Sequence, residues 1–476
     1  MEKQNYIINA GPRGTFHQSA NYRTEPRDVD ILIEHIKAEK PEQITLFFHG
    51  GLVKESLGIE TALRLYPLLK TDNNLPLFLV WETGLIETIK NEILDVSIDK
   101  LFNTILRRTI QVMEKRLGLE NAGGKGVSNW TDDKIIAEEL KKTRPFDHME
   151  KTPKIVARGA AVMMLPSEPY MLEGLLREDF DSLLEHDYEL KLLLSEQHKT
   201  GAKGLISIVT LVASLAKIGF RIIKRHQNDR DHGFFPTIVE EIFRQFYLSD
   251  IGSEIWGNMK EKAHLVWKNN QGLTGNNQHA GRYLFDHLAI YAEQMKNEGR
   301  PIKINLVGHS AGSIVICELL KEIAITYPHQ KFNHILLLAP ACRTDLFVNE
   351  VVKHPERFNK LHCFTMSDAN ECKDTLVPHL YTRSLLYFIS GVLEAKGKGF
   401  DEYIVGMERY LNNKEPYNID ENLQLVRDFF KQEKNQYITS ESLADALVGF
   451  RTTSLKHGDF DENEPTLESI YHILNS

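Results

Sequence analysis

The chain has 476 residues and a formal net charge of −9, with 42% apolar and 26% charged residues. This balance is ordinary for a globular protein that can bury a sizeable core. Nucleic-acid binding needs clustered Lys and Arg, and no long basic run stands out, so nucleic acid is excluded as the main partner. Domains commonly contain about 100–200 residues, so the length indicates two or three units, or one large fold with an insertion.

The four cysteines and the N-terminal residues indicate a cytoplasmic protein. No two of Cys317, Cys342, Cys363 and Cys372 form a C-x-x-C pair, which argues against a disulfide framework and against a structural zinc site. Reduced thiols suit the cytoplasm, and residues 1–16 contain no apolar core of a signal peptide. We expect neither a metal nor a cofactor.

Two short apolar runs near the start of the chain predict buried strands. The run ITLFF occupies 44–48 and is followed by the sequence HGG, and the run PLFLVW occupies 76–81. Apolar residues at helical spacing lie between them, from about 59 to 69. A strand, a helix and a second strand in this order are typical of a parallel α/β sheet.

Residues 88–278 differ in character, because their apolar residues recur mainly at helical period. Within this stretch, 121–155 is polar and loop-like, whereas 204–216 carries no charge. The uncharged run is shorter than the roughly 20 residues that a membrane-spanning helix needs. We expect a buried helix there, with a helix at the membrane surface or in a lid as the alternative.

From about residue 279 onward, strands and helices alternate again. The expected elements are helix 279–296, strand 302–307, helix 311–325, strand 334–338, strand 361–366 and helix 382–395. Strands separated by helices form a parallel sheet covered on both faces, so we expect one α/β sheet domain built from 1–87 and 279–476. The stretch 88–278 is then an inserted helical subdomain, expected as a cap over the carboxyl edge of the sheet, where the crevice of such sheets lies.

The strongest local signal is the sequence GHSAG at 308–312, which fits the pattern G-x-S-x-G. An expected strand precedes it and an expected helix follows it, which is the context of a nucleophile elbow. In such a turn Ser310 has a strained backbone and an exposed Oγ, and the flanking glycines avoid clashes. The N-terminus of the helix favours a developing negative charge. We therefore expect Ser310 to be a nucleophile, against the alternative of a chance match.

With this motif in its context, the chain resembles the α/β-hydrolase-fold serine hydrolases of the lipase and esterase type, over residues 44–81 and 279–476. The segments SLLYFISGVLE and KHGDFDE are similar to a group of uncharacterised bacterial hydrolases that carry a similar large insertion. The resemblance implies an α/β-hydrolase fold and a triad in the chain order Ser, acid, His. It leaves the insertion unexplained.

The expected oxyanion hole combines two main-chain N–H groups. The first belongs to Ala311, the residue after the nucleophile. The second comes from the HGG loop after the strand 44–48, which resembles the corresponding loop of lipases. Gly51 is the expected donor and Leu52 the alternative. A plain Gly-Gly turn that ends the strand is the competing interpretation.

The base and the acid should follow Ser310 in the chain. His457 lies in a loop near the C-terminus, next to a glycine and ahead of an expected helix, and is the expected base among nineteen histidines. Three carboxylates follow the last expected strand. Asp368, nearest to the strand end, is the expected acid, and Glu371 and Asp374 are the alternatives. Asp374 also begins a D-x-x-V-P sequence that resembles loops of some hydrolases.

These residues predict cleavage of a carboxylic ester through an acyl-Ser310 intermediate. Apolar helices in the insertion indicate a lipid-like substrate. A peptidase or amidase would use the same triad, and a third hypothesis is a catalytically silent scaffold whose insertion binds a protein partner. The expected partner is therefore a small ester or a lipid. Contact with a membrane surface through 204–216 is the less favoured alternative.

Overall fold

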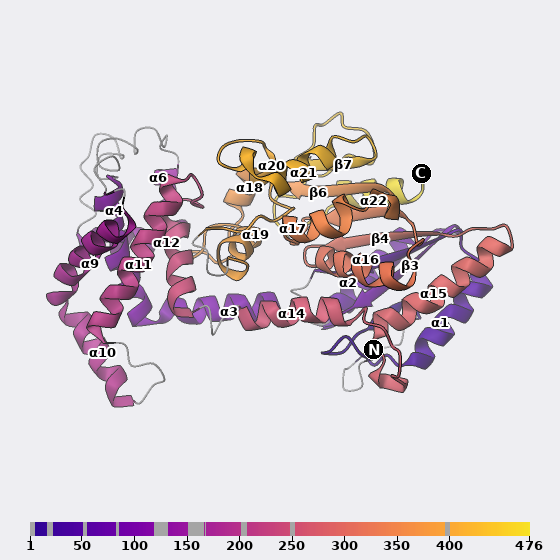
Figure 1. Ribbon diagram of the computed structural model, residues 1–476, viewed down its shortest axis with the longest axis horizontal. Helices are drawn as coiled ribbons and strands as arrows, with labels where there is room; N and C mark the ends of the chain where they lie inside the picture. Colours follow the sequence, from indigo (N-terminus) through magenta and orange to yellow (C-terminus); the bar gives the residue numbers. More distant parts are fainter. Residues whose placement is uncertain are drawn as a thin grey trace. The chain divides into compact units, whose positions relative to one another are not determined.

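The computed structural model divides the chain into two compact units (Figure 1). Unit 1 comprises residues 1–88, 254–374 and 403–476, and unit 2 comprises 89–253 and 375–402. The structure describes residues 5–16, 22–50, 55–81, 85–118, 132–150, 166, 168–200, 207–247, 253–395 and 400–476.

Unit 1 is built on a seven-stranded sheet in the order β1-β3-β2-β4-β5-β6-β7, and every neighbouring pair is parallel. The strands are β1 (Ile7–Asn9), β2 (Gln43–Phe48), β3 (Asn74–Val80), β4 (Lys303–His309), β5 (Phe332–Leu338), β6 (Phe358–Met366) and β7 (Asn435–Ser440). Strand β2 pairs with β4 although unit 2 separates them in the chain, so both halves of the sequence complete one sheet. The predicted parallel α/β sheet is confirmed.

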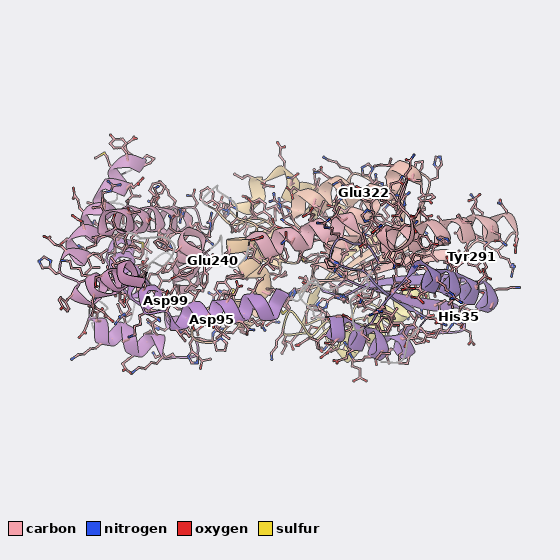
Figure 2. All side chains as sticks on the ribbon, turned by 90° about the horizontal axis from the view of Figure 1, so that it is seen from below. His35, Asp95, Asp99, Glu240, Tyr291 and Glu322 are labelled. Atoms are coloured by element: carbon pink, nitrogen blue, oxygen red, sulfur yellow. The ribbon has the colours of Figure 1, made fainter. Side chains whose placement is uncertain are left out.

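Helices of unit 1 connect these strands and cover the sheet (Figure 1). They are α1 (Pro26–Glu39), α2 (Glu55–Leu69), α14 (Ser253–Leu265), α15 (Ala280–Asn297), α16 (Gly312–Thr326), α17 (Thr344–Phe347), α18 (Asp368–Lys373), α20 (Glu408–Leu411), α21 (Glu421–Phe430) and α22 (Glu464–Leu474). Helices α1 and α15 pack side by side; His35 and Tyr291 mark them in Figure 2. Helix α2 packs against β3, and α16 packs against β2 and β4.

One face of the sheet buries a continuous apolar core. Phe47, Val307 and Leu336 are register neighbours on β2, β4 and β5, and all three are at most 2% exposed. Helix α2 adds its buried stripe to this core, and α22 closes it with Ile470 and Ile473. Each fully buried side chain of this size contributes about 1.5–3 kcal/mol relative to exposure. This core holds α2 and the C-terminal segment on the sheet.

Residues 254–278 belong to unit 1, which corrects the expected boundary at 278/279. The reason is the packing of Trp267, a fully buried side chain whose ring lies edge-on to Phe48 at 5.8 Å. Its indole N–H donates to the carbonyl of Val315 on α16 at 3.0 Å. The chain is therefore anchored to the sheet domain before residue 279.

Unit 2 is helical throughout the elements that the structure describes. These are α3 (Leu85–Ile98), α4 (Lys100–Leu117), α5 (Asp133–Leu140), α6 (Asp147–Glu150), α9 (Pro169–Glu185), α10 (Tyr188–Thr200), α11 (Ile208–Gln227), α12 (Phe234–Ile242), the π-helix η2 (Phe243–Tyr247), α19 (Leu385–Phe388) and the π-helix η6 (Ile389–Leu393). Asp99 precedes helix α4 as its N-cap (Figure 2), and its carboxylate accepts the N–H of Leu101 at 2.8 Å.

The uncharged run 204–216 forms the start of α11, and its first three residues lie outside the described ones. Leu211, Val212 and Leu215 are buried, whereas Val209 is 77% exposed, so the run buries one face of an amphipathic helix. Within the described ranges, no helix is both long and apolar enough to cross a membrane.

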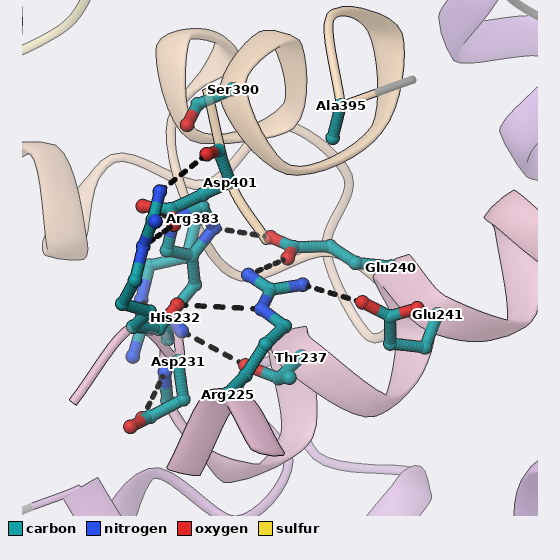
Figure 3. A network of polar contacts seen from close by, with 12 residues as sticks. Arg225, Asp231, His232, Thr237, Glu240, Glu241, Arg383, Ser390, Ala395 and Asp401 are labelled. Carbon is teal, nitrogen blue, oxygen red and sulfur yellow. Dashed lines mark hydrogen bonds and ion pairs between the residues drawn. The ribbon is translucent and has the colours of Figure 1, made fainter. Parts of the chain in front are cut away.

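A buried network of charged side chains joins α11 and α12 to the segment 375–402 (Figure 3). Arg225 is fully buried, and its Nη2 lies 2.6 Å from Glu240 Oε2. Tyr381 donates its hydroxyl hydrogen to Glu240 at 2.6 Å, and Arg230 donates to Asp401 at 2.6 Å.

This network explains a second correction to the expected domains. The residues 375–402 were expected within the sheet domain, but their polar side chains are paired with unit 2. Removing one partner of a buried ion pair leaves an uncompensated charge, which is costly. Ion pairs and hydrogen bonds therefore hold the segment 375–402 to α11, α12 and the loop between them. No local sequence pattern predicts these contacts.

Replacing Arg225 with Met should lower the free energy of unfolding of unit 2 by about 3–5 kcal/mol, because the buried carboxylates of Glu240 and Glu241 would each lose an ion pair with a fully buried arginine. Thermal and denaturant unfolding measure the change. The matched control is Arg177→Met, at an exposed position of α9. Equal stability of the two variants would contradict the role of the network.

Two buried histidines should make unit 1 sensitive to acid. Burial first, and nearby positive charge second, lower the pKa of His334 and of His362 to about 4. The unfolded chain binds these protons near pH 6.5 and the folded chain does not, so stability should fall as the pH drops from about 6.5 to about 4. The double variant with Gln at both positions should show a smaller fall in unfolding midpoint over this range. The exposed His329→Gln should leave the pH dependence unchanged.

Candidate active site

Ser310 sits in a tight turn between strand β4 and helix α16. Its φ is 51°, a left-handed conformation that is costly for a residue with a side chain. The turn is held by the N–H of Ser310, which donates to the carbonyl of Leu338 at the end of β5 at 2.8 Å. This is the geometry of a nucleophile elbow.

Two glycines allow the elbow to close. A Cβ on Gly312 would lie 2.3 Å from the carbonyl oxygen of Phe48, and one on Gly308 would lie 2.8 Å from the backbone of Gly312. Because neither residue has a side chain, helix α16 can begin directly against the end of β2. The same approach brings Gly50 beside the nucleophile, where an added Cβ would be 3.4 Å from Ser310 Cβ.

His457 lies beside Ser310, with its Nε2 2.8 Å from the serine Oγ. It comes from the loop before α22 and is buried. Both main-chain groups of His457 are hydrogen-bonded: its N–H donates to Asp374 Oδ2 at 3.0 Å, and its carbonyl accepts from His309 Nε2 at 3.0 Å. The imidazole can therefore exchange a proton with the Ser310 hydroxyl without a large movement.

The three carboxylates after β6 occupy different places. Asp368 is the first residue of α18, and its N–H donates to Glu408 Oε2 at 2.8 Å. Glu371 is fully buried on the same helix. Asp374 ends α18 and contacts the main chain of His457. Geometry thus brings Asp374 to His457, although Asp368 lies nearer to the strand end in the sequence.

The expected oxyanion hole is described only in part. Ala311 is the buried N-cap residue of α16, and the first N–H groups of a helix have no acceptor within it. This N–H stands directly after Ser310, as the prediction requires. Gly51 and Leu52 lie outside the described residues.

The start of the expected oxyanion loop is fixed by His49, a role that the sequence pattern did not reveal. Its Nε2 accepts the N–H of Trp81 at 3.1 Å, and the Trp81 indole N–H donates back to the His49 carbonyl at 3.1 Å. The other ring nitrogen, Nδ1, carries the hydrogen and donates it to the carbonyl of Gly50 at 2.7 Å. Burial lowers the pKa of His49 to about 4, which keeps the ring neutral near pH 7, and the two hydrogen bonds fix its tautomer.

A cavity of about 450 Å³ opens beside Ser310 within unit 1. Its lining residues are His49, Gly50, Leu57, Glu60, Thr61, Arg64, His309, Ser310, His457, Gly458, Asp461 and Glu462. This volume is within the range of sites that bind small molecules, about 300–1,000 Å³. No group of three or more potential metal ligands gathers in the part of the chain that the structure describes.

Comparison with protein families gives a match over part of the chain. Residues 266–373 match a family described as "Alpha/beta hydrolase of unknown function (DUF900)". The matched part includes β4, β5, β6 and the elbow at Ser310, and it ends before His457. Together with the parallel sheet, it shows that the chain has the α/β-hydrolase fold. Comparisons with curated proteins and with solved structures give no match.

The elbow should tolerate no side chain at Gly312. Gly312→Ala would press a methyl group against the Phe48 carbonyl, so the variant should lose stability by more than about 2 kcal/mol or fail to fold. Gly458→Ala is the matched control, because a Cβ there meets nothing within 4 Å. Melting temperatures of the two variants test the packing, and an undisturbed Gly312→Ala would refute it.

Proposed function

We propose that this protein is a serine hydrolase that cleaves carboxylic esters through an acyl-enzyme on Ser310. The observation that carries the proposal is the 2.8 Å separation between His457 Nε2 and Ser310 Oγ at a strained elbow. A serine hydroxyl is a weak nucleophile unless an adjacent base takes its proton. The pair in this geometry supplies both groups.

In the proposed reaction, Ser310 Oγ attacks the ester carbonyl carbon while His457 Nε2 accepts the hydroxyl proton. The oxyanion of the tetrahedral intermediate is stabilised by the Ala311 N–H and, as the second donor, by Gly51. His457 then gives its proton to the leaving alcohol. A water molecule, activated by His457, hydrolyses the acyl-Ser310 bond and restores the free enzyme.

Asp374 is the proposed acid of the triad, in place of Asp368. Support comes from its carboxylate, which already accepts the main-chain N–H of His457 at 3.0 Å. A carboxylate at this position would stabilise the imidazolium that forms during the reaction. The chain order Ser310, Asp374, His457 also agrees with the order in this fold.

An ester is the proposed substrate because its carbonyl group reacts with a serine nucleophile more readily than that of an amide. A peptidase would use the same residues. Among the described residues that line the cavity, Leu57 is the one large apolar side chain and several of the others are charged, so the proposal is made for carboxylic esters in general. A panel of p-nitrophenyl esters with acyl chains of increasing length would define the acyl preference. The scaffold hypothesis predicts no turnover of any of them.

Ser310→Ala should abolish ester hydrolysis, with a loss of about 10⁶-fold in kcat, while the melting temperature stays close to that of the wild type. The matched control is Ser182→Ala on the exposed side of α9, which should keep full activity. Wild-type turnover by purified, folded Ser310→Ala would sink the proposal.

The choice of acid has its own test. Asp374→Asn should lower kcat by about 10⁴-fold, because the amide no longer stabilises the charged imidazole. Asp368→Asn should stay within a few-fold of the wild type, since the carboxylate that accepts the main-chain N–H of His457 is that of Asp374. Steady-state kinetics on one ester compares the two, and a larger loss in Asp368→Asn would reverse the assignment.

A further inference from the structure

A second histidine holds the proposed base by its main chain. His309 is the residue directly before the nucleophile and the last residue of β4. Its Nε2–H donates to the carbonyl of His457 at 3.0 Å, and both residues are at most 7% exposed. With the N–H of His457 held by Asp374, the peptide groups on both sides of the base are fixed.

The second ring nitrogen of His309 lies near a carboxylate. Its Nδ1 lies 3.6 Å from Asp461 Oδ1, so Asp461 stands on the side opposite the His457 carbonyl. Asp461 is in turn bound by Arg64 of helix α2, which donates to the Asp461 carbonyl and lies 3.5 Å from its Oδ2. A chain of polar contacts thus runs from α2 through Asp461 and His309 to the loop of the base.

We propose that His309 is a positioning residue for catalysis, which acts by fixing the backbone of His457 relative to Ser310. The proposal rests on the proposed serine hydrolase function. His309 and Ser310 are consecutive, so the contact fastens the base loop to the strand that carries the nucleophile. A displacement of about 1 Å between reacting groups can cost about 10²-fold in rate.

The test compares three variants at one position with a single p-nitrophenyl ester. His309→Leu, which cannot donate, should lower kcat by about 10²-fold and leave KM within about twofold. His309→Gln can place an amide N–H near the position of Nε2 and should recover kcat to within about fivefold of the wild type. His309→Asn has a shorter side chain and should resemble the Leu variant.

The outcomes separate this inference from the proposed function. An inactive wild type would remove the function itself. An active wild type with unchanged kcat in His309→Leu would overturn the positioning role alone. If the Leu variant does not fold, the Gln and Asn variants decide, and equal kcat values for these two would overturn the inference. Melting temperatures of all variants distinguish lost positioning from lost folding.

Discussion

The close approach of helix α16 to the end of strand β2 is the constraint on which the site depends. It needs glycine at 308 and 312, because the backbone of one element occupies the space where a side chain of the other would lie. The approach forces Ser310 into its left-handed conformation and presents the start of a helix at the nucleophile. The end of β2, with His49 and Gly50, is brought to the same point. The proposed nucleophile and one proposed oxyanion donor therefore follow from a single packing requirement.

The proposed base and acid are held by elements that are remote in the sequence. His457 stands before α22, whose apolar face packs on the core shared with α2. Asp374 is the last residue of its segment of unit 1, and the next residue belongs to unit 2. The charged network around Arg225 fixes the segment that follows Asp374 within unit 2. The residue proposed to orient the base is thus the last one before the chain passes from unit 1 into unit 2.

The sequence predicted the parts of this arrangement that have local signatures. The elbow, the strand before it, the helix after it and the loop of His457 are recognisable because turn residues and apolar periods are short-range features. The sequence favours Asp368 over Asp374 because Asp368 lies nearer to the strand end. Nearness in the sequence does not reveal helix α18, which turns the chain between the two residues. Strands β1 and β7 were missed, since three residues in one and polar residues in the other give little apolar pattern. The pairing of 375–402 with unit 2 and the contact of His309 with His457 arise only on folding.

The most direct test of the central claim is to map the residue that a fluorophosphonate modifies in the folded protein. The probe reacts with an activated serine, so peptide mass spectrometry of the treated protein should find the adduct on the peptide that contains Ser310. The Ser310→Ala variant should carry none. An adduct on another residue, or a folded wild-type protein that remains unmodified, would contradict the account.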